Sequence, residues 1–214
     1  MISFDRREAL RYMGYHGAEP DAAVAESLER CAAELQAAVQ PKSISARFPL
    51  SFTGENTMQI GDLTVTSANL ARNLRGCTEV YLMAATLGIG ADRLIARASA
   101  VRMSDAVILQ AVAAAMIETC CDEVNDALRR TAEREGLYCR PRFSPGYGDF
   151  SIEHQRDFSR LLDTPRKIGL TVTESCLLAP IKSVTAIIGL SSEKQDCHRK
   201  GCEECGKTDC NFRR

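Results

Sequence analysis

Residues 80–87 read VYLMAATL, a continuous apolar run that predicts a buried central strand. Gly88 and Gly90 follow the run and lead into a helical stretch at 91–97. Such a turn can cradle phosphate, but the third glycine of that motif is missing, which favours a simple packing turn. From Ser104 onward, apolar residues recur with helical spacing and predict an Ala-rich central helix of roughly thirty residues.

The rest of the chain adds helices and strands in mixed order. Two helices are expected in the first forty residues, starting after Asp5 and Asp21. Alternating patterns predict strands at 44–50, 171–173 and 183–189, and a tight hairpin around Gly61-Asp62. No repeated βαβ unit occurs, so the pattern favours an α+β fold with an antiparallel sheet. We divide the chain into an N-terminal helical part (1–41), an α+β core (42–192) and a cysteine-rich tail (193–214).

Composition excludes several classes of protein. The 214 residues are 45% hydrophobic and 26% charged, an ordinary globular composition. The net charge of −1 argues against a general nucleic-acid binder. No apolar run approaches the length of a membrane span, and no signal-peptide core follows the first residues, so we expect a cytoplasmic protein without a membrane.

A Pro/Gly-rich loop and one acidic residue are the candidate binding residues. The loop at 140–149 reads RPRFSPGYGD, and its prolines would hold Arg142 and Tyr147 in fixed relation. Arg142 offers a planar fork for a carboxylate, and Tyr147 offers a flat face and a hydroxyl. The loop could equally be a surface turn. Glu118 lies in the most apolar part of the long helix, so it either faces water or meets a positive group. Its neighbours Cys120 and Cys121 point about 100° apart on a helix and are interpreted as packing residues.

The tail carries a predicted metal site. Its cysteines have the spacing C-x4-C-x2-C-x4-C, and four thiolates this close can wrap one centre. The spacing is compatible with an iron–sulfur cluster or with zinc, and a tail without metal also remains open. The predicted ligands are Cys197, Cys202, Cys205 and Cys210.

Three ordered motifs resemble one known family. Residues 142–147 (RFSPGY), 169–175 (GLTVTES) and 180–184 (PIKSV) are similar to the activation domain of cobalamin-dependent methionine synthase. The resemblance covers roughly residues 80–190. It implies a C-shaped α+β domain, with a twisted antiparallel sheet flanked by helices, that binds S-adenosylmethionine in a shallow groove. The sequence departs from the family at Phe143, where the family has proline.

The resemblance also implies a set of ligand contacts. Arg142 would bind the carboxylate of S-adenosylmethionine, while Tyr147 and the backbone of Pro145 and Gly146 would line the ligand. Glu118 would face the ligand's cationic part. No side chain would act as acid or base, because methyl transfer from a sulfonium moves no proton.

The function implied is reactivation of a separate cobalamin-dependent methionine synthase by reductive methylation of cob(II)alamin. S-adenosylmethionine would give the methyl group, and flavodoxin or ferredoxin would give the electron. Two alternatives stay open. One is a non-catalytic module that binds S-adenosylmethionine or a corrinoid protein, and the other is an activator of another corrinoid methyltransferase.

Overall fold

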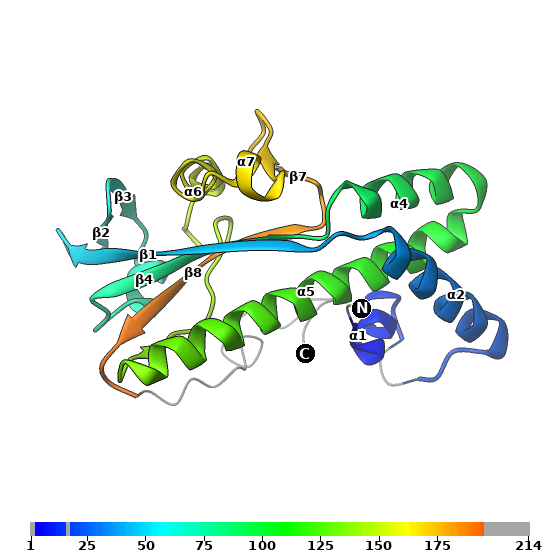
Figure 1. The fold of residues 1–214 in the computed structure, drawn as a ribbon, viewed down its shortest axis with the longest axis horizontal. Coiled ribbons are helices and arrows are strands. Elements are labelled where there is room, and N and C mark those ends of the chain that lie inside the picture. Colours follow the sequence, from blue (N-terminus) through cyan, green and yellow to red (C-terminus); the bar gives the residue numbers. More distant parts are fainter. Residues whose placement is uncertain (1–2, 16–17, 195–214) are drawn as a thin grey trace.

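A six-stranded antiparallel sheet forms the centre of the computed structural model, which describes residues 3–15 and 18–194. The strand order is β3-β2-β1-β4-β8-β5, and β6 and β7 form a separate hairpin. The sheet is twisted and carries helices on both faces, so the α+β prediction is confirmed (Figure 1). The strands are β1 (Lys42–Phe52), β2 (Thr57–Ile60), β3 (Leu63–Thr66), β4 (Glu79–Thr86), β5 (Tyr138–Cys139), β6 (Thr171–Val172), β7 (Leu178–Ala179) and β8 (Ser183–Ser191).

The helices form one layer on each face of the sheet. The long helix α5 runs along one face, where α1, α2 and α4 pack against it near one end. On the opposite face lie α6, α7 and the β6–β7 hairpin (Figure 1). The helices are α1 (Arg6–Tyr12), α2 (Ala22–Ala38), α3 (Ala68–Asn73), α4 (Ile89–Val101), α5 (Met103–Arg134), α6 (Gln155–Leu162) and α7 (Thr164–Ile168), with a 3₁₀ turn at Ile152–His154.

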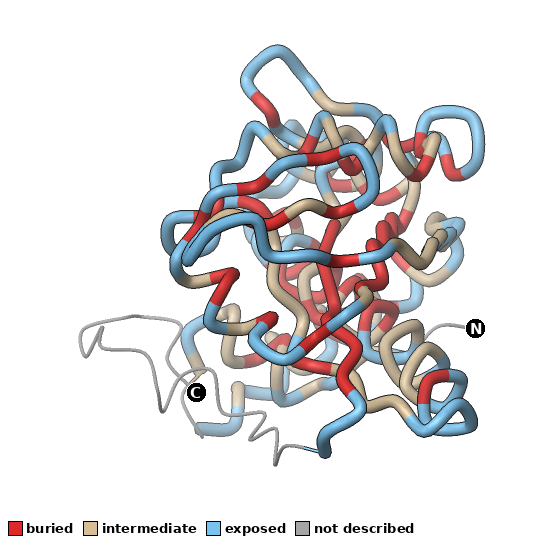
Figure 2. Tube along the Cα trace, turned by 90° about the vertical axis from the view of Figure 1, so that its left-hand side faces the viewer, coloured by how far each residue is buried: buried red, intermediate tan, exposed pale blue. Residues whose placement is uncertain are grey.

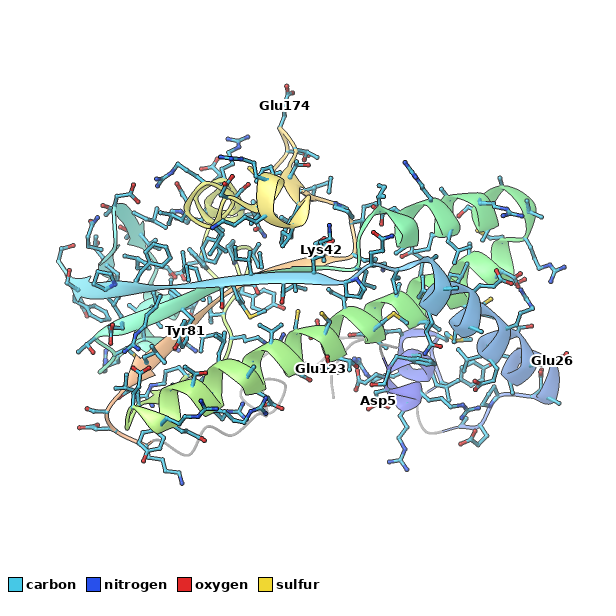
Figure 3. All side chains as sticks on the ribbon, in the orientation of Figure 1. Asp5, Glu26, Lys42, Tyr81, Glu123 and Glu174 are labelled. Atoms are coloured by element: carbon cyan, nitrogen blue, oxygen red, sulfur yellow. The ribbon has the colours of Figure 1, made fainter. Side chains whose placement is uncertain are left out.

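Strand β4 is the predicted central strand. It pairs along its whole length with β1 on one side and β8 on the other. Every second side chain, beginning with Tyr81, joins the core that α5 covers, and the others join the core under α3, α6 and α7. Side chains fill the space between sheet and α5, where Tyr81 lies (Figure 3). A strand buried on both faces explains why its sequence is continuously apolar.

Helix α5 has the predicted length and central position. Twelve of its residues are buried. The buried residues of the described chain gather in the middle of the molecule, with exposed segments around them (Figure 2). By length and composition an 18-residue window of α5 is apolar enough to cross a membrane, so the expectation that no apolar stretch approaches the length of a membrane span was wrong. However, 61% of that apolar window is buried inside the protein, as is usual for a core helix.

The glycine turn after β4 serves packing. A Cβ atom at Gly90 would lie 2.0 Å from the backbone oxygen of Ala38, a distance that no side chain can adopt. Gly88 has φ +81° and approaches Gln40. Both glycines therefore let the start of α4 approach the end of α2 closely, as expected for a packing turn.

Most remaining elements also match the sequence. Asp5 and Asp21 cap α1 and α2 as predicted, because their carboxylates accept hydrogen bonds from the first backbone N–H groups. The hairpin around Gly61 forms between β2 and β3. Strands β5 and β7 and helix α7 were not predicted, because elements of two to five residues are too short to show a periodic pattern.

Candidate functional site

The loop after β5 is fixed to strand β8 by backbone hydrogen bonds. Phe143 donates its N–H to the Ile187 oxygen (2.9 Å) and accepts from the Ile187 N–H (2.8 Å). One step earlier, the Arg140 N–H donates to the Gly189 oxygen (2.8 Å). These bonds extend the pairing of β5 and β8 to the neighbour of Arg142, so the backbone beside this arginine is held by the sheet.

The turn after Phe143 is closed by its own hydrogen bonds. The Tyr147 N–H donates to the Ser144 oxygen (3.1 Å), and the Gly146 N–H donates to the Phe150 oxygen (2.7 Å). Gly146 has φ +96°, a conformation that favours glycine. The Phe143 and Tyr147 rings meet edge to face, with centroids 6.0 Å apart. The turn therefore holds Tyr147 in fixed relation to the anchored strand.

The far end of the loop is clamped to helix α3 by Asp149. Its carboxylate accepts hydrogen bonds from the Ser67 hydroxyl (2.5 Å) and from the N–H groups of Ala68 (2.7 Å) and Asn69 (3.1 Å). These contacts lower the pKa of Asp149 below its usual value. The hydrogen bond from Ser67 is the largest cause, and the two backbone N–H groups lower the pKa further. The first N–H groups of a helix have no acceptor within the helix itself, so they stabilise an anionic side chain placed at the helix N-terminus.

A small pocket of about 110 Å³ lies between this loop, α5 and β8. It is lined by Glu118, Arg142, Ser144, Tyr147 and Val184. Three predicted site residues, Arg142, Tyr147 and Glu118, therefore meet around one hollow. Pro145 is buried and Gly146 is exposed in the same turn, but neither is among the lining residues.

Arg142 lies between two carboxylates of α5. Its Nη2 atom donates to Asp122 Oδ1 (2.9 Å) and to Glu118 Oε2 (3.3 Å). Glu118 is thus both partly exposed (38% of its side chain) and paired with a positive group, so the two alternatives from sequence are combined. One positive and two negative charges meet here, and the net charge of the cluster is negative.

Two further ionisable groups near Arg142, the Tyr147 phenol and the Cys121 thiol, have raised pKa values. Desolvation is the largest cause of the raised pKa of Tyr147, and the charge of Glu118 is the second largest. The phenol therefore stays protonated at neutral pH and can donate a hydrogen bond. Burial raises the pKa of Cys121 to about 12, so this thiol stays protonated and is a packing residue, as predicted.

The pocket is suited to binding rather than to proton transfer. The guanidinium can bind a carboxylate, the two acidic groups can face a cation, and Tyr147 supplies a hydroxyl and a ring face. Sequence analysis missed Asp122, although it lies four residues after Glu118 and so on the same face of the helix. It also gave no role to Ser144, Val184 or Asp149, whose positions depend on contacts between distant segments.

The predicted metal ligands lie outside the described residues. Cys197, Cys202, Cys205 and Cys210 all fall in the range 195–214. Within residues 3–15 and 18–194, no group of three or more His, Cys, Asp or Glu side chains could hold a metal ion. The metal site of the tail stays a prediction.

Comparison with solved structures identifies the class of fold. The chain is similar to the MetH reactivation domain in a crystal structure bound to AdoHcy, with a TM-score of 0.62. The match covers 88% of this chain and 76% of that chain, at 15% sequence identity. No family model and no curated protein sequence matches the chain. The fold is therefore that of a reactivation domain, and the function must be argued from the pocket.

Replacing Asp149 by Ala tests the clamp on the loop. The variant leaves the N–H groups of Ala68 and Asn69 without their acceptor, so the melting temperature should fall at pH 7. Because the folded pKa of Asp149 is lowered, its stabilising effect is complete above the unfolded pKa and is lost as the pH falls. The difference in melting temperature between Asp149→Ala and wild type should therefore shrink below about pH 4.

Glu153→Ala is the matched control, since Glu153 is an exposed acidic residue of the next turn. Thermal unfolding from pH 3 to pH 7 measures both variants. Equal melting temperatures of Asp149→Ala and wild type at pH 7 would show that the clamp contributes nothing.

Proposed function

We propose that the chain binds S-adenosylmethionine at the Arg142 pocket and serves as an activation module for a cobalamin-dependent methionine synthase. The observation that carries this proposal is the meeting of Arg142, Tyr147 and Glu118 around one hollow. The reactivation-domain fold supports it, because the similar domain was crystallised with AdoHcy. A ligand with a carboxylate, an amino group and a sulfonium matches the chemistry of these residues.

Charge favours the sulfonium form of the ligand. S-adenosylmethionine carries two positive groups and one carboxylate, so its net charge is positive, whereas the demethylated product is neutral. The cluster of Arg142, Glu118 and Asp122 has a net negative charge. The substrate is therefore attracted more strongly than the product, which helps the product to leave after methyl transfer.

Arg142→Ala tests the binding site. If the guanidinium makes a charged hydrogen bond to the ligand carboxylate, its loss costs about 1.5–3 kcal/mol, or about 10- to 150-fold in Kd. Isothermal titration calorimetry with S-adenosylmethionine measures the change. Arg130→Ala is the control, since Arg130 is an exposed arginine further along α5. Unchanged affinity of the Arg142 variant would refute the assignment.

The proposed reaction requires no acid or base from this chain. One electron and the methyl group of S-adenosylmethionine convert cob(II)alamin to methylcobalamin, with S-adenosylhomocysteine as the other product. The residues of the pocket hold the donor so that its methyl group faces the corrinoid, and no proton is moved. We propose flavodoxin or ferredoxin as the electron donor, and a corrinoid protein as the binding partner.

A reactivation assay separates this function from its alternatives. The full chain is added to an inactive cob(II)alamin methionine synthase that lacks its own activation domain, with a reductant and S-adenosylmethionine. We expect turnover to be restored by wild type and by Arg130→Ala, and less by Arg142→Ala. Binding of S-adenosylmethionine without restored turnover would favour a non-catalytic module or an activator of another corrinoid methyltransferase.

We also propose that the cysteines of the tail bind one metal centre in the reducing environment of the cytoplasm. Metal analysis of the purified chain should find iron with sulfide, or zinc, and only an iron–sulfur cluster would give visible absorption. The double variant Cys202→Ser/Cys205→Ser should lose the metal, whereas Cys139→Ser, in strand β5, should keep it. A wild-type chain free of iron and zinc would refute this proposal.

A further inference from the structure

The Arg142 pocket is too small for the whole of S-adenosylmethionine. Its volume is about 110 Å³, whereas pockets for small-molecule ligands generally measure roughly 300–1,000 Å³. The residues around it match the amino-acid part of the ligand, which carries the carboxylate and the ammonium. The adenosyl part must therefore lie on a neighbouring surface.

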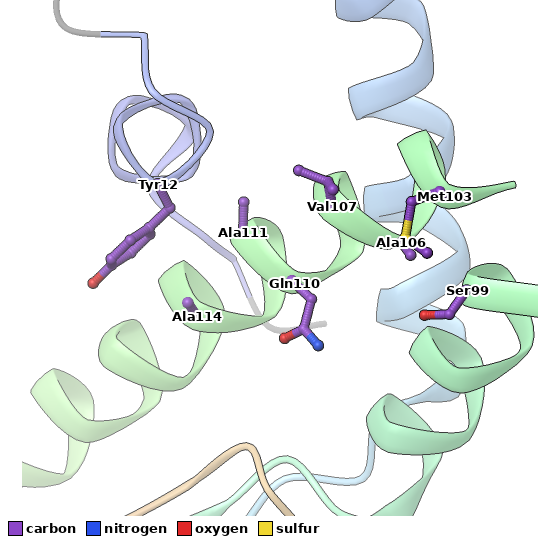
Figure 4. A pocket seen from close by; sticks show the side chains of 8 residues that line it. All are labelled: Tyr12, Ser99, Met103, Ala106, Val107, Gln110, Ala111 and Ala114. Carbon is purple, nitrogen blue, oxygen red and sulfur yellow. The ribbon is translucent and has the colours of Figure 1, made fainter.

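A second, larger cavity of about 390 Å³ lies on the same helix (Figure 4). Helices α1, α4 and α5 form its walls, and most of its surface is apolar. The lining residues are Tyr12, Ser99, Met103, Ala106, Val107, Gln110, Ala111 and Ala114.

The two cavities are neighbours along one face of α5. Ala111, Ala114 and Glu118 follow at intervals of three and four residues, so they share that face. From Gln110 to Glu118 the helix rises about 12 Å. The Tyr12 phenol in the larger cavity also contributes to the raised pKa of Tyr147 in the smaller one, so the two side chains lie within electrostatic reach. A ligand of extended shape can thus reach both cavities at once.

The larger cavity has the groups that a purine base needs. Its alanines leave space for a flat ring, and the Tyr12 ring lies at one end near Ala114 (Figure 4). The guanidinium of Arg11 covers the Tyr12 ring, 4.6 Å from its centroid, and so helps to hold it in place. Stacking of a base on an aromatic ring is a common mode of nucleoside binding.

Gln110 supplies the hydrogen-bonding pattern that distinguishes adenine. A side-chain amide offers one donor and one acceptor, which match the N7 and N6 atoms of adenine. The Gln110 side chain is exposed and points toward the gap between α5 and α4, where Ser99 also points (Figure 4). The backbone oxygen of Gln110 accepts a hydrogen bond from Lys182 Nζ (3.3 Å), which ties this turn of α5 to the start of β8.

We propose that this cavity is the adenosyl subsite, with Tyr12 and Gln110 binding the adenine base while Arg142 binds the amino-acid end. This inference rests on the proposed function. It assigns each half of the ligand to a different group of residues, so the two halves can be tested as separate molecules. Methionine represents the amino-acid half, and 5′-methylthioadenosine represents the adenosyl half.

Ala114→Trp in the full chain tests the position of the subsite, because the indole fills the cavity from a half-buried position of α5. By calorimetry, the affinity for 5′-methylthioadenosine should fall about 10-fold or more, and the affinity for methionine should stay within about 2-fold. Ala127→Trp is the matched control, since Ala127 is an exposed alanine of α5 outside both cavities. Melting temperatures verify that both variants fold.

Gln110→Ala tests base recognition without filling the cavity. Wild type should prefer 5′-methylthioadenosine to 5′-methylthioinosine, in which an oxygen replaces the amino group, by about 5- to 150-fold, the range for a bidentate amide contact. The variant should lose this preference. A preference that is equal in wild type and Gln110→Ala would overturn the role of Gln110.

The outcomes separate this inference from the proposed function. If S-adenosylmethionine binds with a dependence on Arg142 but Ala114→Trp binds it as tightly as wild type, the subsite is wrong and the proposed function stands. If wild type binds 5′-methylthioadenosine in the cavity but no S-adenosylmethionine, the subsite is supported and the proposed function fails.

Discussion

The two backbone hydrogen bonds between Phe143 and Ile187 are the contact on which the Arg142 pocket depends. They attach the Pro/Gly-rich loop to β8, the strand that lies beside β4 under α5. Asp149 attaches the other end of the loop to α3. Since both ends are fixed, Arg142 and Tyr147 reach the pocket from a backbone that is already ordered, and a ligand need not order it.

The arrangement of charges follows from this anchoring. Arg142 lies beside Glu118 and Asp122 without any ligand, and these carboxylates hold its guanidinium in the pocket. A ligand carboxylate must therefore share the guanidinium with both acids, which lowers the affinity for a ligand that carries only a negative group. A ligand with an additional positive group compensates for the carboxylates that it approaches. In the proposed function, the same three side chains thus favour a ligand that carries both charges over one that is only anionic.

The sequence predicted the elements whose residues repeat with a clear period or form one long apolar run. Strand β4 and helix α5 were found because their burial imposes such patterns over eight and thirty-two residues. Arg142 and Tyr147 were predicted as site residues because they lie in a loop rich in proline and glycine. Glu118 was predicted because it is a charged residue in the most apolar part of a helix. The cavity at Tyr12 and Gln110 left no such signal, because it arises where three helices meet and its walls are ordinary alanines. Contacts between distant segments, such as Asp149 with α3, have no local pattern either.

Phe143, which stands where the resembled family has proline, holds the loop through a hydrogen bond that a proline could not make. A proline has no N–H group and could not donate to the Ile187 oxygen, whereas Phe143 makes this bond and adds ring contacts to Tyr147 and Phe150. Rigidity that a proline would supply through its own ring is supplied here by pairing with the sheet. Phe143 therefore holds the loop by pairing with β8, directly beside the arginine that contacts α5.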